Sequence, residues 1–391
     1  MSLRTENVSM QEERGDTCGL DQRRRHHPLE PLLFLYITER CQLRCQHCYM
    51  GSRLSHGRDM APDEIQRLLR YLKIVFGQTK VYLLGGEPTL HPAFFDVLRV
   101  CREEGYWVSV TSNGLFLQDL WSALPEGLVN EWAFSIDGSC RDTHELLRGK
   151  GTFDHTVSNI LNAVEREHTV RLVYTVTSQN KGEVEPLIDM FAGRGIRAIS
   201  FHYFSPIGLG GSNTDLLLSP GDWTDFYREL KSISLGGVGV SLYCPPTFVS
   251  NDDLPDIVRR GYRGCVARNF ERLAIFPDKR IYLCSAFLDT DLHYGEFKDG
   301  AIRSRGDFGS ARESALILTL PERCLSCKNA AMCRGGCMAW HNSLQINMMD
   351  LCNRQLIPLC PLWSIAIDGN NEPAKTPKVM AGKDAGLYEV F

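Results

Sequence analysis

The sequence predicts an α/β protein in which a partial (β/α)6 TIM-like barrel is followed by a small cysteine-rich domain. Between residues 32 and 203, six short apolar runs alternate with segments of helical periodicity. From about Tyr262 onward, cysteines become frequent and the periodicity fades. Alternating strands and helices favour a parallel sheet with crossover helices, and right-handed crossovers curl such units into an open barrel. A doubly wound open sheet is the alternative.

Each predicted element carries a local signal. The continuous apolar run over 32–37 is typical of a strand buried on both faces. Pro62 suits the first turn of the helix expected over 62–76, and Gly77 suits its C-terminal cap. The further strands are expected over 81–84, 107–111, 132–136, 172–177 and 198–203. The further helices are expected over 92–104, about 117–124, 153–164, 184–191 and 222–235, with a loop over 204–219.

Composition and charge suggest how the chain is divided and where it works. The first 30 residues are polar and mixed in charge, without the apolar core of a signal peptide. No stretch approaches the roughly 18 apolar residues that span a bilayer, and the formal charge of −4 predicts no nucleic-acid partner. We expect a cytoplasmic protein without a membrane partner. Its expected segments are a flexible arm (1–30), the barrel (31–243), the cysteine-rich domain (244–364) and a C-terminal tail (365–391).

The 15 cysteines fall largely into two groups, and in a reducing compartment clustered cysteines more often bind metal. Cys41, Cys45 and Cys48 follow the first strand directly. Iron–sulfur clusters are usually held by four cysteines, so three thiolates within eight residues would leave one iron open to another ligand. The alternative is a zinc site completed by His47 or His56.

Three more motifs follow the next three strands. They are Gly85-Gly86-Glu87-Pro88, Thr111-Ser112-Asn113-Gly114 and Ser135-Ile136-Asp137-Gly138. Each stands at the carboxyl end of its strand, the rim where barrel active sites form. Glycines there let the backbone approach a ligand closely. The four motifs together predict one binding site at this rim.

The triplet spacing, with the aromatic Tyr49 after the third cysteine, resembles the radical S-adenosylmethionine family. The resemblance implies a [4Fe–4S] cluster chelated by S-adenosylmethionine, whose cleavage yields a 5′-deoxyadenosyl radical. It also implies roles for the rim residues. Gly85, Gly86 and Glu87, followed by Pro88, would meet the methionine amino group, while Ser112 and Asn113 would bind its carboxylate or ribose. Ser135 and Asp137 complete the expected cofactor rim, and Arg148 is either a carboxylate partner or a surface charge.

The second group contains Cys324-x2-Cys327-x5-Cys333-x3-Cys337, and it resembles the SPASM extension of radical enzymes, which carries two auxiliary [4Fe–4S] clusters. The resemblance implies that Cys265, Cys284 and Cys337 hold the first cluster, with Cys244 as a candidate fourth ligand or an open iron. Cys324, Cys327 and Cys333 would hold the second with Cys360 or Cys352, and Cys360 is preferred because it precedes Pro361. Lys279 stands where the family usually has Gly. Paired zinc knuckles are the alternative.

Most SPASM members act in peptide or protein maturation, so the resemblance implies a radical oxidoreductase that oxidises or crosslinks a peptide of the RiPP type. A reductant such as flavodoxin or ferredoxin would be needed, and a leader peptide would be bound by another surface or by a separate protein. The alternative is a dehydrogenase or epimerase of a small molecule such as a sugar or aminocyclitol, with Cys140 as hydrogen donor or as a plain loop residue. Ser285 after Cys284 counts against sulfatase maturation. A non-catalytic iron–sulfur electron carrier is the third hypothesis.

Overall fold

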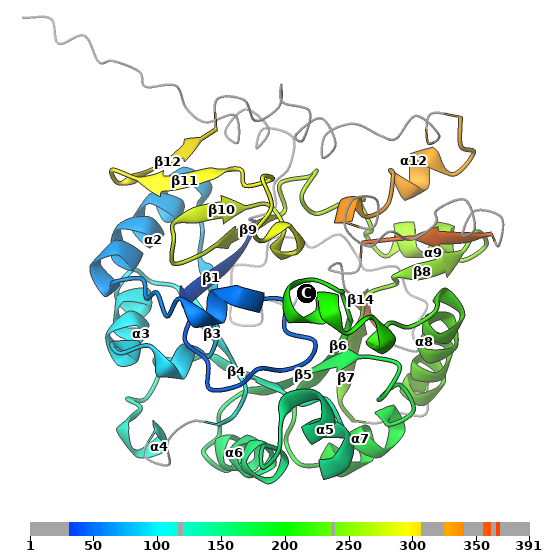
Figure 1. Ribbon diagram of the computed structural model, residues 1–391, viewed down its shortest axis with the longest axis horizontal. Helices are drawn as coiled ribbons and strands as arrows, with labels where there is room; N and C mark the ends of the chain where they lie inside the picture. Colours follow the sequence, from blue (N-terminus) through cyan, green and yellow to red (C-terminus); the bar gives the residue numbers. More distant parts are fainter. Residues whose placement is uncertain are drawn as a thin grey trace, which may run out of the picture.

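The computed structural model describes residues 31–115, 120–235, 239–305, 324, 326–339, 355–360 and 365–367. Seven neighbouring strands of one sheet run parallel and curl around a common interior, with helices on the outside (Figure 1). The predicted α/β class with a partial barrel is confirmed. These strands are β1 (Leu32–Thr38), β2 (Lys80–Gly85), β3 (Trp107–Ser112), β4 (Glu131–Ser135), β5 (Val170–Val176), β6 (Ala198–Tyr203) and β7 (Ser241–Cys244).

The helices cover the outer face of this sheet and bury their apolar sides against it. In α2, for example, Ile65, Leu68 and Leu72 are fully buried, as their helical spacing predicts. The barrel helices are α2 (Pro62–Phe76), α3 (Phe94–Glu103), α4 (Leu120–Ala123), α5 (Arg141–Arg148), α6 (Phe153–Glu165), α7 (Val184–Phe191) and α8 (Pro220–Leu235).

Most of the strands after residue 243 extend the same sheet, at one edge or the other. β9 (Arg272–Ile275) lies parallel to β1, and β10 (Arg280–Tyr282), β11 (Gly295–Lys298) and β12 (Ala301–Ser304) continue from it. At the other edge, β14 (Ile365–Ala366) pairs with β7. The cysteine-rich region therefore shares the barrel sheet, and the domain boundaries predicted above stay a prediction. The remaining elements are the pair β8 (Phe248–Ser250) and β13 (Leu356–Pro358), and the helices α9 (Leu254–Arg259) and α12 (Ala330–Cys333).

Local differences from the expected elements have simple causes. α5 was not expected, because its eight residues are mostly polar; it buries His144, Leu147 and Arg148. The expected loop over 204–219 contains two short 3-10 turns, η3 (Gly208–Ser212) and η4 (Thr214–Leu216). Lys279 adopts a left-handed conformation with φ 68°, the conformation that glycine favours, so the β9–β10 turn forms without a glycine. Among the described residues, none of the helices is long and apolar enough to cross a bilayer.

Candidate active site

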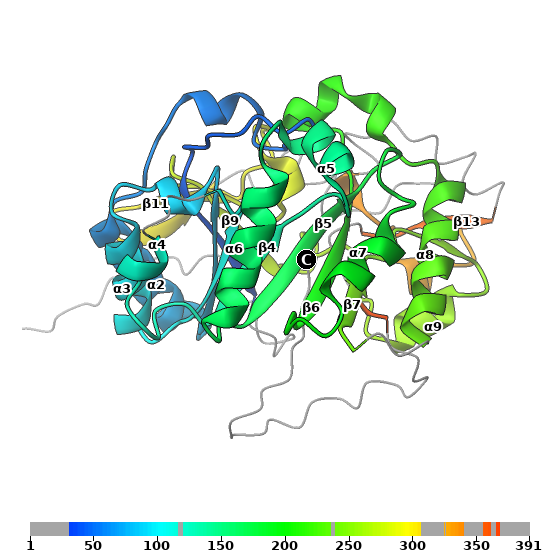
Figure 2. The same ribbon diagram turned by 90° about the horizontal axis from the view of Figure 1, so that it is seen from below.

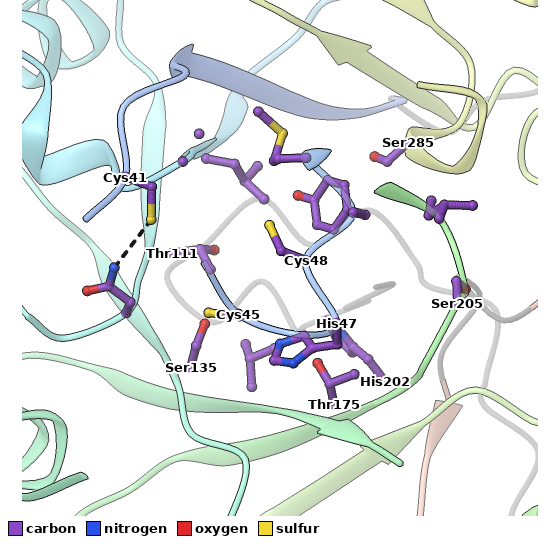
Figure 3. Close-up of a pocket in the computed structure, with 18 of the residues that line it drawn as sticks. Cys41, Cys45, His47, Cys48, Thr111, Ser135, Thr175, His202, Ser205 and Ser285 are labelled. Atoms are coloured by element: carbon purple, nitrogen blue, oxygen red, sulfur yellow. Dashed lines mark hydrogen bonds between the residues drawn. The ribbon is translucent and has the colours of Figure 1, made fainter. Parts of the chain in front are cut away.

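The loop that follows β1 carries Cys41, Cys45 and Cys48. It lies at the carboxyl end of the strands, beside α5 (Figure 2). The sulfur atoms of the three cysteines face one space (Figure 3), a cavity of about 240 Å³ that they line. Backbone bonds hold the loop from two sides, since Gln46 N donates to Leu147 O (2.9 Å) and Leu209 N donates to Cys48 O (2.8 Å). The structure thus brings the predicted triplet together.

Burial makes these thiols poor acids while they carry no metal. It raises the pKa of Cys41 to about 12 and that of Cys45 to about 11, and it also raises the pKa of Cys48. A buried thiolate is stable only beside positive charge, and a metal ligand has to be a thiolate. Three thiols that face one cavity, one of them buried and two partly buried, therefore fit a site that metal binding completes.

Two glycines let the end of β2 pack directly on the cysteine loop. A Cβ atom on Gly86 would stand 2.2 Å from the Arg40 carbonyl oxygen and 2.8 Å from the Cβ of Cys41. On Gly85 it would stand 2.5 Å from the carbonyl oxygen of Thr38. Glu87 N donates to the same Arg40 oxygen at 2.6 Å. No side chain fits at these positions, and both glycines line the cavity.

Glu87 is buried and uses its carboxylate to join two rim segments. The carboxylate accepts hydrogen bonds from Thr89 N (3.2 Å), Ser112 Oγ (3.0 Å) and Asn113 N (2.7 Å). Burial raises its pKa, and these bonds oppose the rise. Neither Glu87 nor Pro88 lines the cavity, whereas Ser112, Asn113 and Ser135 do. Glu87 therefore positions the rim, and contact between its carboxylate and a ligand stays a prediction.

Arg148 and Asp137 form a buried ion pair behind the cysteines. Arg148 Nε lies 2.5 Å from Asp137 Oδ2, and the Arg148 residue is only 8% exposed, so the surface-charge alternative for Arg148 is wrong. Asp137 Oδ1 also accepts from Thr175 N at 2.7 Å. His47 Nε2 lies 3.3 Å from Asp137 Oδ2, while burial lowers the pKa of His47 to about 4 and keeps the ring neutral near pH 7. Of these three side chains, Arg148 and His47 line the cavity and Asp137 does not.

Two residues that line the cavity, Tyr36 and Ser285, were not predicted to belong to this site. Tyr49 donates a hydrogen bond from its hydroxyl to Tyr36 (2.9 Å), which donates to Ser285 Oγ (3.0 Å). The chain of hydroxyls thus links the residue after Cys48 with the residue after Cys284. Tyr36 sits inside β1 and Ser285 follows β10, so only the pairing of β1 with β9 brings them together. No local pattern could have predicted this contact.

Cys140 lies outside the cavity. It is exposed at the N-terminus of α5, where its sulfur contacts Thr143 Oγ1 (3.5 Å) and Glu183 Oε1 (3.7 Å). This position gives no support to its expected role as a hydrogen donor to a bound substrate.

The later cysteines form two sets, and Cys360 lies in a different set from the one predicted. The Cys360 thiol hydrogen-bonds with Cys337 and interacts electrostatically with Cys265 and Cys284. The sequence analysis preferred Cys360 for the second set, whereas the structure brings its thiol next to Cys337 of the first set. The cluster that Cys360 would ligate stays a prediction. Its segment is held there because Leu359 N donates to Thr247 O (2.8 Å) beside the β8–β13 pair.

The second set contains Cys324, Cys327 and Cys333, whose thiols interact with one another. Cys352 lies outside the described residues. Cys244 is fully buried in β7, where its charged neighbour is Arg260, and it does not join either set. Within the described ranges, no three His, Cys, Asp or Glu side chains converge on a single metal ion. The ligands of a four-iron cluster lie farther apart than those of a single metal ion, because each iron takes its own thiolate.

The fold and the site define a partial-barrel protein with a three-thiol site at the carboxyl rim of its strands. The model of the Radical SAM superfamily matches residues 35–191, the segment that carries the triplet and the rim motifs. The family match supports a [4Fe–4S] cluster and S-adenosylmethionine as cofactors. The close backbone packing at Gly85 and Gly86 and the three cysteine thiols that line the cavity fit these cofactors. The match bears out the resemblance to the radical S-adenosylmethionine family, and the structures described next share the fold. The resemblance of the later cysteines to a SPASM extension stays a prediction.

Solved structures share the fold well beyond the matched segment. SuiB of Streptococcus suis bound to S-adenosylmethionine aligns with a TM-score of 0.61 and 18% identity, over 81% of this chain and 76% of SuiB. The protein anSMEcpe with bound AdoMet and Kp18Cys peptide aligns with a TM-score of 0.62 and 21% identity, over 81% of this chain and 92% of that one.

The curated relatives share a shorter segment. The Fe-coproporphyrin III synthase of Methanosarcina barkeri is 28% identical over 194 residues, 48% of this chain and 48% of the relative. A probable GTP 3′,8-cyclase of Saccharolobus solfataricus is 29% identical over 185 residues, 47% of this chain and 59% of the relative. The chain therefore spans about half the length of the curated relatives that it matches.

The close packing of Gly86 against Arg40 and Cys41 leads to the first prediction. Gly86→Ala would push the end of β2 away from Arg40 and Cys41, so we expect loss of most of the iron held by the triplet. Gly182→Ala is the matched control, because a Cβ there meets nothing within 4 Å. Iron content and S-adenosylmethionine binding after anaerobic reconstitution check the prediction. Equal iron and binding in both variants would contradict the proposed close contact.

The position of Cys360 yields the second prediction. If Cys265, Cys284, Cys337 and Cys360 hold an auxiliary [4Fe–4S] cluster, Cys360→Ala removes one of its four ligands, and we expect an altered electron paramagnetic resonance signal and loss of up to about four irons per chain. Cys244→Ala, a change of the same size at a buried site, should keep the iron content of the unmodified protein. A Cys244→Ala variant that loses iron while Cys360→Ala keeps it would reverse the assignment.

Proposed function

We propose that the protein is a radical S-adenosylmethionine oxidoreductase. It removes a hydrogen atom from a peptide or protein substrate, and the substrate is thereby oxidised or crosslinked. The observation that carries this proposal is the single cavity shared by Cys41, Cys45 and Cys48, Gly86 and Asn113. When bound, the [4Fe–4S] cluster and S-adenosylmethionine would supply the 5′-deoxyadenosyl radical that abstracts the hydrogen.

In this proposal the chain's own residues bind the two cofactors and shield the radical. The three thiolates of the triplet would ligate the cluster, and the backbone at Gly85 and Gly86 would lie against the ligand, because neither residue has a side chain to keep it away. Asn113 offers its amide nitrogen 3.9 Å from the Cys41 sulfur, and hydrogen bonds to cluster sulfur atoms are one means of setting a potential. With substrate bound, the mostly apolar lining of the cavity would keep water from a carbon radical and so limit side reactions.

The auxiliary sets support oxidation rather than simple hydrogen transfer. Cys265, Cys284, Cys337 and Cys360 would hold one auxiliary cluster, and Cys324, Cys327 and Cys333 would hold a second, completed outside the described residues. A cluster beside the cavity can accept the electron that a substrate radical loses on oxidation. The Tyr49–Tyr36–Ser285 hydroxyl chain supports this arrangement, since it runs from the cavity to the residue after Cys284. Flavodoxin or ferredoxin would provide the reducing electron in the cytoplasm.

A peptide substrate is supported by what the similar structures contain. SuiB is also seen bound to the precursor peptide SuiA, and anSMEcpe is seen bound to Kp18Cys and Cp18Cys peptides. In this proposal the peptide would enter the open rim above the cavity, with a separate protein binding any leader segment.

A small-molecule substrate is the second candidate. The names of the curated relatives refer to GTP and to Fe-coproporphyrin III, which are small molecules. The exposed position of Cys140 weighs against an epimerase that uses this thiol. A non-catalytic electron carrier would have no use for a cavity in front of the triplet.

The test of the proposed activity is the formation of 5′-deoxyadenosine by the reconstituted, reduced protein, measured by mass spectrometry. Cys41→Ala, Cys45→Ala and Cys48→Ala should each lower it at least ~100-fold while the auxiliary iron remains, because a removed ligand of the triplet cannot be replaced by another described cysteine. Cys101→Ala, at a buried cysteine of α3 outside the cavity, is the control and should keep full formation.

Two outcomes separate the candidate functions. A fully loaded protein that forms no 5′-deoxyadenosine would favour the electron carrier. Where it does form, candidate peptides and small molecules are compared by product mass. A loss of two hydrogens indicates oxidation, and an unchanged mass with deuterium taken up from heavy water indicates epimerisation.

A further inference from the structure

The end of helix α5 is fastened to the cysteine loop. Gln46, between Cys45 and Cys48, donates from its backbone N to Leu147 O (2.9 Å) and from its side-chain Nε2 to Leu146 O (2.7 Å). Arg148 is the next residue, so the position of its backbone is fixed relative to the two cysteines. Its guanidinium lines the same cavity as the sulfur atoms of Cys45 and Cys48.

Arg148 is only 8% exposed and lines the same cavity as these sulfur atoms, so solvent screens its positive charge only in part. Burial raises the pKa of both thiols, and Arg148 opposes the rise at both. At Cys45 the effect of Arg148 is larger than the opposite effect of Asp137. Within the ion pair, Arg148 lines the cavity that contains these sulfur atoms and Asp137 does not, so the cation lies on the cavity side of the pair and its counter-ion behind it.

The other charged groups near Arg148 do not cancel this effect. His47 contacts Asp137 but is neutral near pH 7, since burial lowers its pKa to about 4. His144 has its pKa lowered to about 4 by burial and by Arg148, and it accepts a hydrogen bond from Asp137 N through Nδ1 (3.2 Å). Arg44 also favours the Cys48 thiolate, from an exposed position where salt screens it.

We propose that Arg148 raises the reduction potential of the iron–sulfur cluster held by Cys41, Cys45 and Cys48, and that Asp137 limits this rise as its counter-ion. The inference rests on the proposed function, because it needs the cluster in this site. Reduction adds one negative charge to the cluster, and a buried cation nearby stabilises the charged product more than the oxidised form. Arg148 is therefore a positioning residue that acts through the thiolates.

Two substitutions with opposite expected signs test the proposal. Arg148→Gln removes the cation and should move the midpoint potential of the triplet cluster to a more negative value. We expect at least a tenfold lower ratio of reduced to oxidised cluster at a fixed potential, which is about 59 mV for one electron. Asp137→Asn removes the anion and should move the potential in the positive direction. A merely structural role of the pair gives no reason for opposite signs.

The measurement is a redox titration of the reconstituted protein, followed by electron paramagnetic resonance without S-adenosylmethionine. Arg148→Lys keeps the charge and should restore most of the original potential. Arg141→Gln is the matched control, because Arg141 lies on the same helix but is exposed and pairs with Asp154. It should leave the potential unchanged.

Several outcomes would overturn the proposal, and they differ from a failure of the proposed function. A potential that is equal in Arg148→Gln and the unmodified protein overturns it, even where S-adenosylmethionine binds more weakly, since Arg148 would then act only as a carboxylate partner. Shifts of the same sign in Arg148→Gln and Asp137→Asn also overturn it. If Arg148→Gln does not fold, Asp137→Asn still tests the sign, since a potential that is unchanged or more negative in this variant overturns the proposal. An unmodified protein that binds no cluster in the triplet refutes the proposed function instead.

Discussion

The close contact between Gly86 and the backbone at Arg40 and Cys41 is the constraint on which the site depends. Parallel pairing of β1 with β2 ends both strands at one rim, and the absence of a side chain on Gly86 lets the next segment lie directly on the cysteine loop. Glu87 then ties this segment to the end of β3 through Ser112 and Asn113. The cysteine loop is thus fixed by backbone packing on one side, and its thiols turn inward to the cavity.

The sheet continues beyond the barrel strands, and this continuation brings the two cysteine regions together. β9 pairs with β1 on the side away from β2, so the turn that leads to Cys284 comes to lie over the first strand. The sheet thereby joins the two cysteine regions, and the hydroxyl chain of Tyr49, Tyr36 and Ser285 crosses the boundary between them. A substrate held in the cavity would have the triplet on one side and an auxiliary set on the other.

The parts of the account that the sequence predicted are those with a short-range signal. Apolar runs and helical periodicity predicted the strand order of the barrel, and the spacing of Cys41, Cys45 and Cys48 predicted their convergence. The position of glycines after β2 predicted a close approach of the backbone. In each case the residues concerned lie within one motif or one element, where geometry follows from local periodicity.

The parts that the sequence did not predict depend on long-range packing. Arg148 could not be distinguished from a surface charge, because its burial requires α5, a short and mostly polar helix, to fold over the cysteine loop. Cys360 could not be assigned, because its place beside Cys337 depends on the pairing of β13 with β8. Tyr36 was treated as one apolar residue of a buried strand, since its partner Ser285 is 249 residues away.

The central claim is that the triplet holds a cluster with one iron open to S-adenosylmethionine. The most direct measurement is the electron paramagnetic resonance spectrum of the reduced, reconstituted protein before and after this nucleotide is added. The account predicts a changed signal from the triplet cluster, and no change in a Cys41→Ala variant that keeps its auxiliary iron. A spectrum of the unmodified protein that stays the same at saturating nucleotide would contradict it.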